Sequence, residues 1–156
     1  MTLAAVSDAG PLIHLAEIDP LELLSAFDTP LVPGAVYEEV DAGGVPDRLA
    51  DIPYELVEAD ESRVDAEELD AGERAAISIA KERGVVLLTD DLAARETASE
   101  TDVEVHGSIG VIALGYAGGI LERDEAASLM RALQRETSLF VTEAVVEPGI
   151  RMLDEQ

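Results

Sequence analysis

Short apolar runs alternate along this chain with longer segments in which apolar residues recur at helical spacing. The runs that favour strands are residues 3–7, 31–32, 54–57, 85–88, 103–105 and 140–141. Helical spacing covers residues 12–18, 21–27, 33–42, 73–83, 92–99, 107–117, 122–135 and 143–153. Strands that alternate with helices require crossover connections, which place the strands mainly parallel. The pattern therefore predicts an α/β fold of three layers, with helices on both faces of a mainly parallel sheet.

The carboxyl ends of two predicted strands carry aspartates. The first strand ends at Asp8, and the continuous apolar run at residues 85–88 ends in Thr89-Asp90-Asp91. Such a continuous run is typical of a strand that is buried on both faces of a sheet. Ligands of parallel α/β sheets bind outside the carboxyl ends of the strands, so we expect the chemistry at this edge.

The composition indicates a foldable, cysteine-free domain. The 156 residues suit one domain, residues 1–156, and 47% of them are hydrophobic, enough for a core. The absence of cysteine excludes disulfides, thiolate metal sites and cysteine nucleophiles. No apolar stretch reaches the length of a membrane span, and Asp8 interrupts the apolar N-terminal run, which also lacks a basic region. We expect a soluble cytoplasmic protein.

Charge is the unusual feature of the composition. The chain has 34 acidic and 10 basic residues, a formal net charge of -24, and Lys81 is its single lysine. Such a surface repels itself in dilute buffer, and molar salt removes most of that repulsion. The composition resembles that of halophilic proteins. It also argues against a broad electrostatic nucleic-acid interface, so any contact with RNA must be local.

Four segments together resemble the motifs of the PIN-domain family. They are VSDAGPLI at the first strand, VPGAVYEEV at a helix, GERAAISIAKERGVVLLTDD at a helix and strand, and VEVHGSIGVI. The last is similar to a segment of an uncharacterised PIN subfamily related to VapC-type toxins. The resemblance covers residues 3–145, and it implies a PIN-like three-layer fold. It also implies a ribonuclease that depends on Mg²⁺ or Mn²⁺, with RNA as substrate, an antitoxin protein as a partner and a homodimer as the assembly.

The resemblance assigns both the metal-binding and the catalytic role to four acids: Asp8, Glu39, Glu73 and Asp91. Glu38 competes with Glu39, and Asp90 competes with Asp91. The candidates for secondary contacts to the metal site or the substrate are Asp90, Thr89, Ser108 and Arg95, and Thr89 and Ser108 also fit a strand end or a helix cap. Gly10 departs from the family pattern, which often has a hydroxyl residue there. Carboxylates suit Mg²⁺ and Mn²⁺, because hard cations prefer oxygen ligands.

Other interpretations of the same residues remain open. Acids make up 34 of 156 positions, so a single matching acid carries little weight in this background. The acidic stretch at residues 58–70 is interpreted as a solvated loop that leads into a helix, without chemistry of its own. His14 is interpreted as a packing residue. A non-catalytic PIN-like module that binds RNA or protein is the main alternative, and a phosphoacceptor receiver domain is a third.

Overall fold

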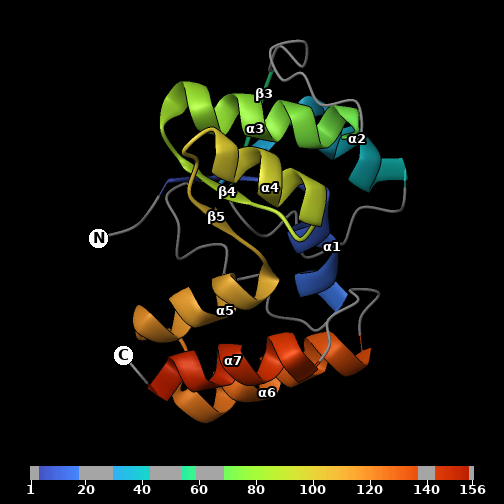
Figure 1. Cartoon of the computed structure of the whole chain (residues 1–156). Coiled ribbons are helices and arrows are strands. Elements are labelled where there is room, and N and C mark those ends of the chain that lie inside the picture. The colour runs from blue at the N-terminus through green and yellow to red at the C-terminus, as the bar shows by residue number, and fades with distance from the viewer. Residues whose placement is uncertain (1–3, 18–29, 43–53, 59–68, 137–142, 155–156) are drawn as a thin grey trace.

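The protein is a parallel sheet covered by helices on both faces (Figure 1). The structure is a computed structural model that describes residues 4–17, 30–42, 54–58, 69–136 and 143–154. The strands are β1 (Ala5–Ser7), β2 (Leu31–Pro33), β3 (Glu55–Val57), β4 (Val86–Leu88) and β5 (Val105–His106). The helices are α1 (Ala9–Glu17), α2 (Gly34–Ala42), α3 (Ala71–Arg83), α4 (Leu92–Glu100), α5 (Ser108–Ala117), α6 (Arg123–Glu136) and α7 (Glu143–Asp154).

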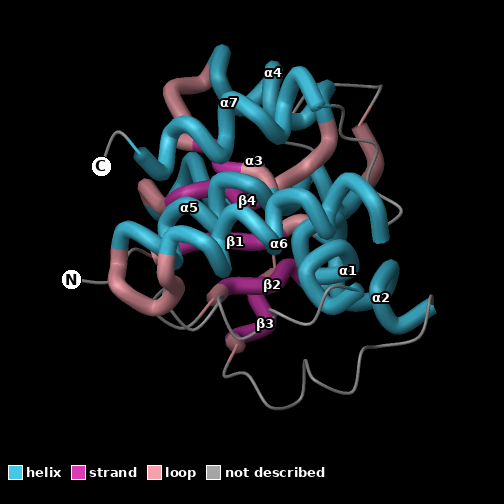
Figure 2. The backbone as a smooth tube through the Cα atoms, turned by 90° about the horizontal axis from the view of Figure 1, so that it is seen from below, coloured by secondary structure: helices cyan, strands magenta, loops and turns pink. Residues whose placement is uncertain are grey.

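The five strands are all parallel and lie in the order β3-β2-β1-β4-β5. Figure 2 shows β3, β2, β1 and β4 side by side in this order. From β1 the chain winds outward to β2 and β3, and from β4 it winds outward to β5 in the other direction. The order therefore reverses between β1 and β4, and the crevice at such a switch point is where α/β sheets bind ligands.

Alternating side chains of the strands feed two hydrophobic cores, one on each face of the sheet. On one face Val6 of β1 and Leu87 of β4 pack with α3 and α4. On the other face Ala5 and Leu88 pack with α1, α5, α6 and α7. Because successive strand residues point to opposite faces, both cores require the continuous apolar runs seen in the sequence. The prediction of three layers is confirmed.

Helix α3 shows how local sequence sets the element boundaries. Asp70 accepts a hydrogen bond from the Glu73 amide (2.8 Å), and the Glu73 carboxylate accepts one from the Asp70 amide (3.0 Å). This reciprocal capping box starts the helix at Ala71, two residues before the predicted start. Gly84 ends it with a φ of 67°, a left-handed conformation that glycine adopts without steric cost.

Most predicted boundaries are correct to within one or two residues, and α1 differs most. The Gly10-Pro11 pair was expected to precede the helix, but α1 begins at Ala9 and includes both residues. Proline is tolerated there because the amides of the first helical turn have no partner within the helix. The predicted helix at residues 21–27 and strand at residues 140–141 lie outside the described residues.

The amphipathic face of α6 belongs to the core. Met130 and Leu133 are fully buried, and Leu129 packs against the same cluster. This face is therefore used for packing on the protein's own α5 and α7. Within the described residues, no helix combines the length and the apolar character needed to cross a bilayer.

Candidate metal centre

Asp8 is a buried carboxylate at the end of the central strand β1. Its amide donates to the Leu88 carbonyl of β4 (2.8 Å), which fixes Asp8 beside the end of that strand. The side chain is 4% exposed, and its Oδ2 accepts a hydrogen bond from Thr89 Oγ1 (2.9 Å). Its Oδ1 is buried and has no hydrogen-bond partner among the described residues. Burial raises the pKa of Asp8 to about 6, although hydrogen bonds from Ala9 and Thr89 oppose the rise.

Two glutamates approach Asp8 from different helices. Glu39 belongs to α2 and Glu73 to the first turn of α3, helices that contact each other. Partial burial raises the pKa of each to about 7, and the charge of Asp8 contributes to both rises. Carboxyl groups raise one another's pKa values in this way only when they are close together. The structure therefore brings three of the four predicted acids into one electrostatic cluster.

Asp70 also belongs to this cluster, in addition to the four predicted acids, and the sequence did not single it out. It lies at the N-cap of α3, and after burial its charge is the largest contribution to the raised pKa of Glu39. Its charge also raises the pKa values of Asp8 and Glu73. The interpretation of residues 58–70 as a stretch without chemistry did not anticipate that Asp70 lies beside the predicted acids. The Asp-x-x-Glu capping pattern at residues 70–73 was the available signal, since it fixes both acids in one turn.

Asp91 completes the cluster from the start of α4. Its Oδ2 caps that helix by accepting from the Ala94 amide (2.8 Å), and its own amide donates to Thr89 Oγ1 (3.2 Å). The charge of Asp91 contributes to the raised pKa values of Asp8 and Glu73, which places it on their side of the strand end. Thr89 thus links the two aspartates, because one hydroxyl donates to Asp8 and accepts from Asp91.

Asp90 points instead toward α1 and α5. His14 donates through Nδ1 to Oδ2 of Asp90 (2.8 Å), and Ser108 donates to Asp90 through both its amide (2.6 Å) and its hydroxyl (2.5 Å). Burial alone would raise the pKa of Asp90, but these bonds lower it below its ordinary value. The interpretation of His14 as a packing residue is therefore wrong, since its ring holds a buried carboxylate.

The remaining candidates lie at the edge of this arrangement. Glu38 and its competitor Glu39 are both exposed on α2, and it is Glu39 on which the charges of Asp70 and Asp8 act. Arg95 is exposed one turn after Asp91, and His106 pairs with the exposed Glu104 at 3.2 Å. Gly10 faces Asp90, because a Cβ at this position would lie 3.4 Å from Asp90 Cβ. A hydroxyl side chain at position 10 would therefore point at Asp90.

The five acids form a cluster without a ready-made cation cage. Within the described residues, no three acidic or histidine side chains converge closely enough to enclose a metal ion. The fit to a cation rests on Asp8 Oδ1, because a buried oxygen without a donor is costly unless a cation or proton satisfies it. The surrounding acids offer further oxygen ligands of the kind that Mg²⁺ and Mn²⁺ prefer.

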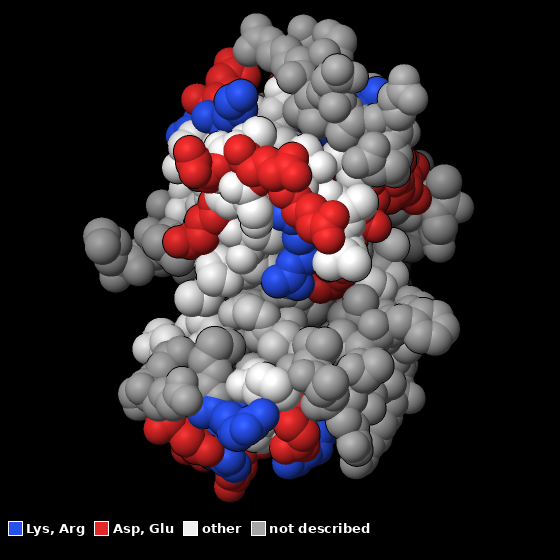
Figure 3. Space-filling view, viewed as in Figure 1, with Lys and Arg blue, Asp and Glu red and all other residues white. Residues whose placement is uncertain are grey.

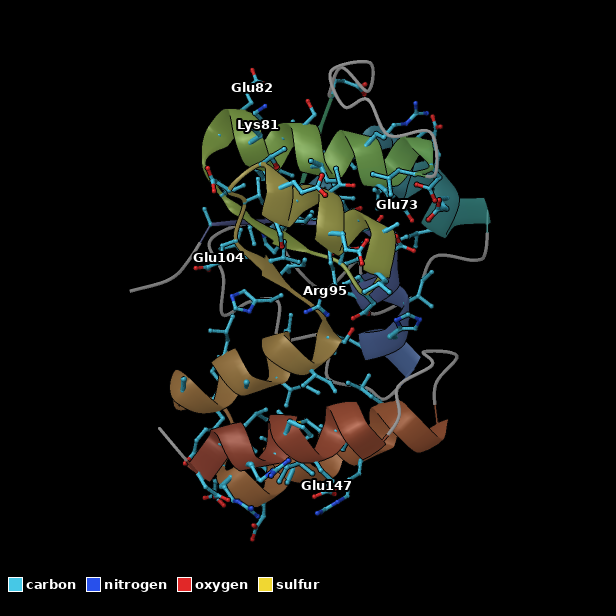
Figure 4. The ribbon with its side chains drawn as sticks, viewed as in Figure 1. Glu73, Lys81, Glu82, Arg95, Glu104 and Glu147 are labelled. Atoms are coloured by element: carbon cyan, nitrogen blue, oxygen red, sulfur yellow. The ribbon has the colours of Figure 1, made fainter. Side chains whose placement is uncertain are left out.

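A cavity of about 380 Å³ lies at the opposite edge of the sheet, where α3 and α4 end and β4 begins. It is lined in part by Lys81, Gly84, Thr101 and Glu104, and none of the five clustered acids lines it. Figure 4 shows Lys81 and Glu82 at one end of α3 and Glu73 toward the other end. A receiver domain needs its lysine beside the strand-end aspartate, so the position of Lys81 excludes that interpretation.

Comparisons with known proteins agree with this architecture. A family model described as a PIN domain matches residues 4–155. Among solved structures, the fold is similar to a PilT N-terminus domain protein from the hyperthermophilic archaeon Sulfolobus solfataricus P2. The TM-score is 0.60 at 17% sequence identity, over 70% of this chain and 90% of the archaeal chain. No curated protein matches the sequence.

Proposed function

Because the chain belongs to the PIN-domain family, we propose that it is a metal-dependent endoribonuclease that hydrolyses phosphodiester bonds of RNA. One observation carries this proposal. Asp8 is a buried carboxylate with an unpartnered oxygen, and the charges of Asp70 and Asp91 act on it. Concentrated negative charge at the switch point of a sheet is unfavourable for folding alone, and a bound divalent cation would offset it.

Asp8, Glu39, Glu73 and Asp91 are the residues that would hold Mg²⁺ or Mn²⁺, with Asp70 beside them. A divalent cation bound there would supply an activated water at neutral pH and neutralise charge on the scissile phosphate. Carboxylate oxygens are suitable ligands for a cation that activates water and neutralises the charge of a phosphate. Neither cysteine nor histidine is needed, which agrees with a chain that contains no cysteine.

The surrounding residues position the carboxylates. Thr89 donates to Oδ2 of Asp8, which leaves Oδ1 as the oxygen available for coordination. Asp91 keeps its orientation because it caps α4 through Ala94. Burial and the neighbouring acids raise the pKa values of Glu39 and Glu73, which favours their protonated forms in the metal-free protein. Cation binding would displace these protons, as it does wherever metal ligands must first deprotonate.

RNA cleavage in molar KCl tests the proposal. Wild-type protein with added Mn²⁺ should cut single-stranded RNA internally, and a chelator should abolish the cleavage. Asp8→Asn should remove activity while keeping the fold, because the amide retains the shape but offers no charge to the cation. Glu38→Gln is the matched control, since Glu38 is exposed on the same helix as Glu39 and should be dispensable.

Two results would contradict the proposal. Mn²⁺ binding without any RNA cleavage would favour the non-catalytic alternative, a PIN-like module that binds RNA or protein. Cleavage that persists undiminished in Asp8→Asn would point to a contaminating nuclease or to a different centre. Parallel purification of the wild type and the variant separates these two cases.

A further inference from the structure

We propose that Arg95 is the residue that binds a phosphate of the RNA beside the carboxylate cluster; this inference rests on the proposed function. Arg95 belongs to the first turn of α4, and its amide donates to the carbonyl of Asp91 (3.0 Å). It therefore follows the cluster by one helical turn. Its side chain is exposed, and Figure 4 shows it between α4 and α5.

Gly107 creates the space that the guanidinium occupies. A Cβ at position 107 would lie 3.0 Å from Nη1 of Arg95 and 2.8 Å from Oδ1 of Asp90. Even the smallest side chain would therefore displace one of these two groups. Gly107 itself has an extended backbone, φ -90° and ψ -172°, so no unusual conformation requires glycine at this position. Glycine at this position therefore lets Asp90 Oδ1 and the Arg95 guanidinium approach the backbone without having to shift.

The Arg95 guanidinium has unused donors. Within the described part of the chain, its side chain forms no hydrogen bond or ion pair. Asp90, the nearby acid, is already bonded to His14 and to both donors of Ser108. Arg123 differs, because its guanidinium is bound to the carboxylate of Asp154 through Nε (2.9 Å) and Nη2 (3.1 Å). A planar fork of free donors suits an anion such as phosphate.

Because the surface is strongly acidic, RNA binding requires a positively charged side chain close to the site of contact. Figure 3 shows acidic side chains gathered over α3 and α4, with a basic group at the middle of this face, where Figure 4 labels Arg95. A chain with a formal net charge of -24 repels the RNA backbone, and a broad basic face is absent from its composition. The Arg95 guanidinium lies by Gly107 at the end of β5, one helical turn after Asp91, and would offset that repulsion for a phosphate that approaches the cluster from this side.

Among the described residues, Arg74 follows Glu73 in α3 and is a second arginine close to the cluster, and it is less suited to the role. Its Nε donates to the backbone carbonyl of Asp70 at 3.4 Å, and the residue is half-buried. Part of its hydrogen-bonding capacity is therefore directed at the cap of its own helix. Arg95 has no such attachment among the described residues.

Fluorescence anisotropy with a labelled single-stranded RNA tests the inference. Binding is measured in molar KCl with Ca²⁺ in place of Mg²⁺, and electrophoresis verifies that the RNA stays intact. Arg95→Ala should weaken RNA binding by about tenfold or more, as expected for the loss of a charge-assisted contact. The RNA affinity of Arg95→Lys should fall between those of the wild type and Arg95→Ala, because lysine keeps the positive charge and lacks the planar fork of guanidinium donors. Arg131→Ala, which removes an exposed arginine from α6, is the matched control and should bind like the wild type.

A second measurement separates binding from structural damage. The Mn²⁺ affinity of Arg95→Ala, from calorimetric titration, should stay within about twofold of the wild-type value, because the carboxylates are unchanged. The salt dependence of RNA binding should also become shallower for Arg95→Ala, by about 0.7 in the slope of log affinity against log salt. A merely structural role would lower the Mn²⁺ affinity and leave this slope unchanged.

Three results would overturn the inference. Equal RNA affinity of wild type and Arg95→Ala would show that Arg95 makes no contact with the phosphate. Equal losses in Arg95→Ala and Arg131→Ala would show a general effect of net charge. A wild type that binds Mn²⁺ but no RNA would remove this inference together with the proposed function, whereas the first two results leave the proposed function intact.

Discussion

Replacing Asp8 by asparagine should stabilise the metal-free protein at neutral pH. Asp8 is 4% exposed, and one of its oxygens has no donor, so the ionised form is held in an unfavourable environment. Asparagine has nearly the same shape and carries no charge. It can still accept the hydrogen bond from Thr89, which now goes to Oδ2 of Asp8.

The size of the effect follows from the pKa of Asp8, which burial raises from its ordinary 3.8 to about 6. Each pKa unit corresponds to about 1.4 kcal/mol, so ionised Asp8 costs about 3 kcal/mol of folding free energy. At a pH between these two pKa values, Asp8 keeps its proton in the folded state and loses it in the unfolded state. Stability therefore decreases as pH rises from about 4 to about 6 and stays low above that window. Asp8→Asn should lack this decrease.

Chemical denaturation in molar KCl with a chelator measures both proteins across the pH range. The two free energies of unfolding should converge near pH 4, and Asp8→Asn should be the more stable protein, by up to about 3 kcal/mol, above pH 6. Saturating Mn²⁺ should reverse the order, because a ligand that binds the folded wild type stabilises it. Asp124→Asn is the control for charge alone, since that side chain is 95% exposed.

A wild type and an Asp8→Asn protein with the same pH dependence in chelator would refute this reasoning. So would an Asp8→Asn protein that is less stable than the wild type at neutral pH. Either result would mean that the Asp8 carboxylate is satisfied by groups within the protein. The negative charge of the cluster would then be compensated within the protein, and no cation would be required.

Four further predictions concern the same edge of the sheet and the charged surface. Thr89→Val should lower the free energy of unfolding by about 1–3 kcal/mol in chelator, since Asp8 Oδ2 loses its donor, and Thr89→Ser should restore it. In calorimetric titrations, Asp91→Asn should weaken Mn²⁺ binding at least about tenfold. Asp90→Asn should instead lower stability by about 1.5–3 kcal/mol, because His14 and Ser108 lose a charged acceptor. Thermal melts should show a higher midpoint in molar than in dilute KCl, and equal midpoints would contradict the interpretation as a halophilic protein.

The fold was predictable because its signals are local. Each buried strand is a short apolar run, each helix has its own apolar periodicity, and Gly84 and Gly118 follow the ends of α3 and α5. The run before Thr89 gave β4 to within one residue, and Gly84 gave the end of α3. The start of α1 was missed because Gly10 and Pro11 favour a break locally, although both are compatible with a first helical turn.

The partners of the acids were less predictable, because they come from residues far apart in the chain. Nothing local indicates that His14 contacts Asp90, which is 76 residues away, or that Ser108 contacts it as well. Asp70 was overlooked because it ends a long acidic stretch in which single acids are uninformative. Asp90 and Asp91 both follow β4, and they differ because Asp91 caps α4 whereas Asp90 bonds to His14 and Ser108.

Anomalous diffraction from crystals soaked in Mn²⁺ at neutral pH would test the metal centre directly. The structure predicts an anomalous peak within coordination distance of Asp8 Oδ1, the buried oxygen without a donor, with oxygens of Glu39, Glu73 or Asp91 completing the contacts. The same peak should be missing from crystals of Asp8→Asn. A peak confined to the cavity beside Lys81 and Glu104, or none at Asp8 in well-occupied soaks, would contradict the account.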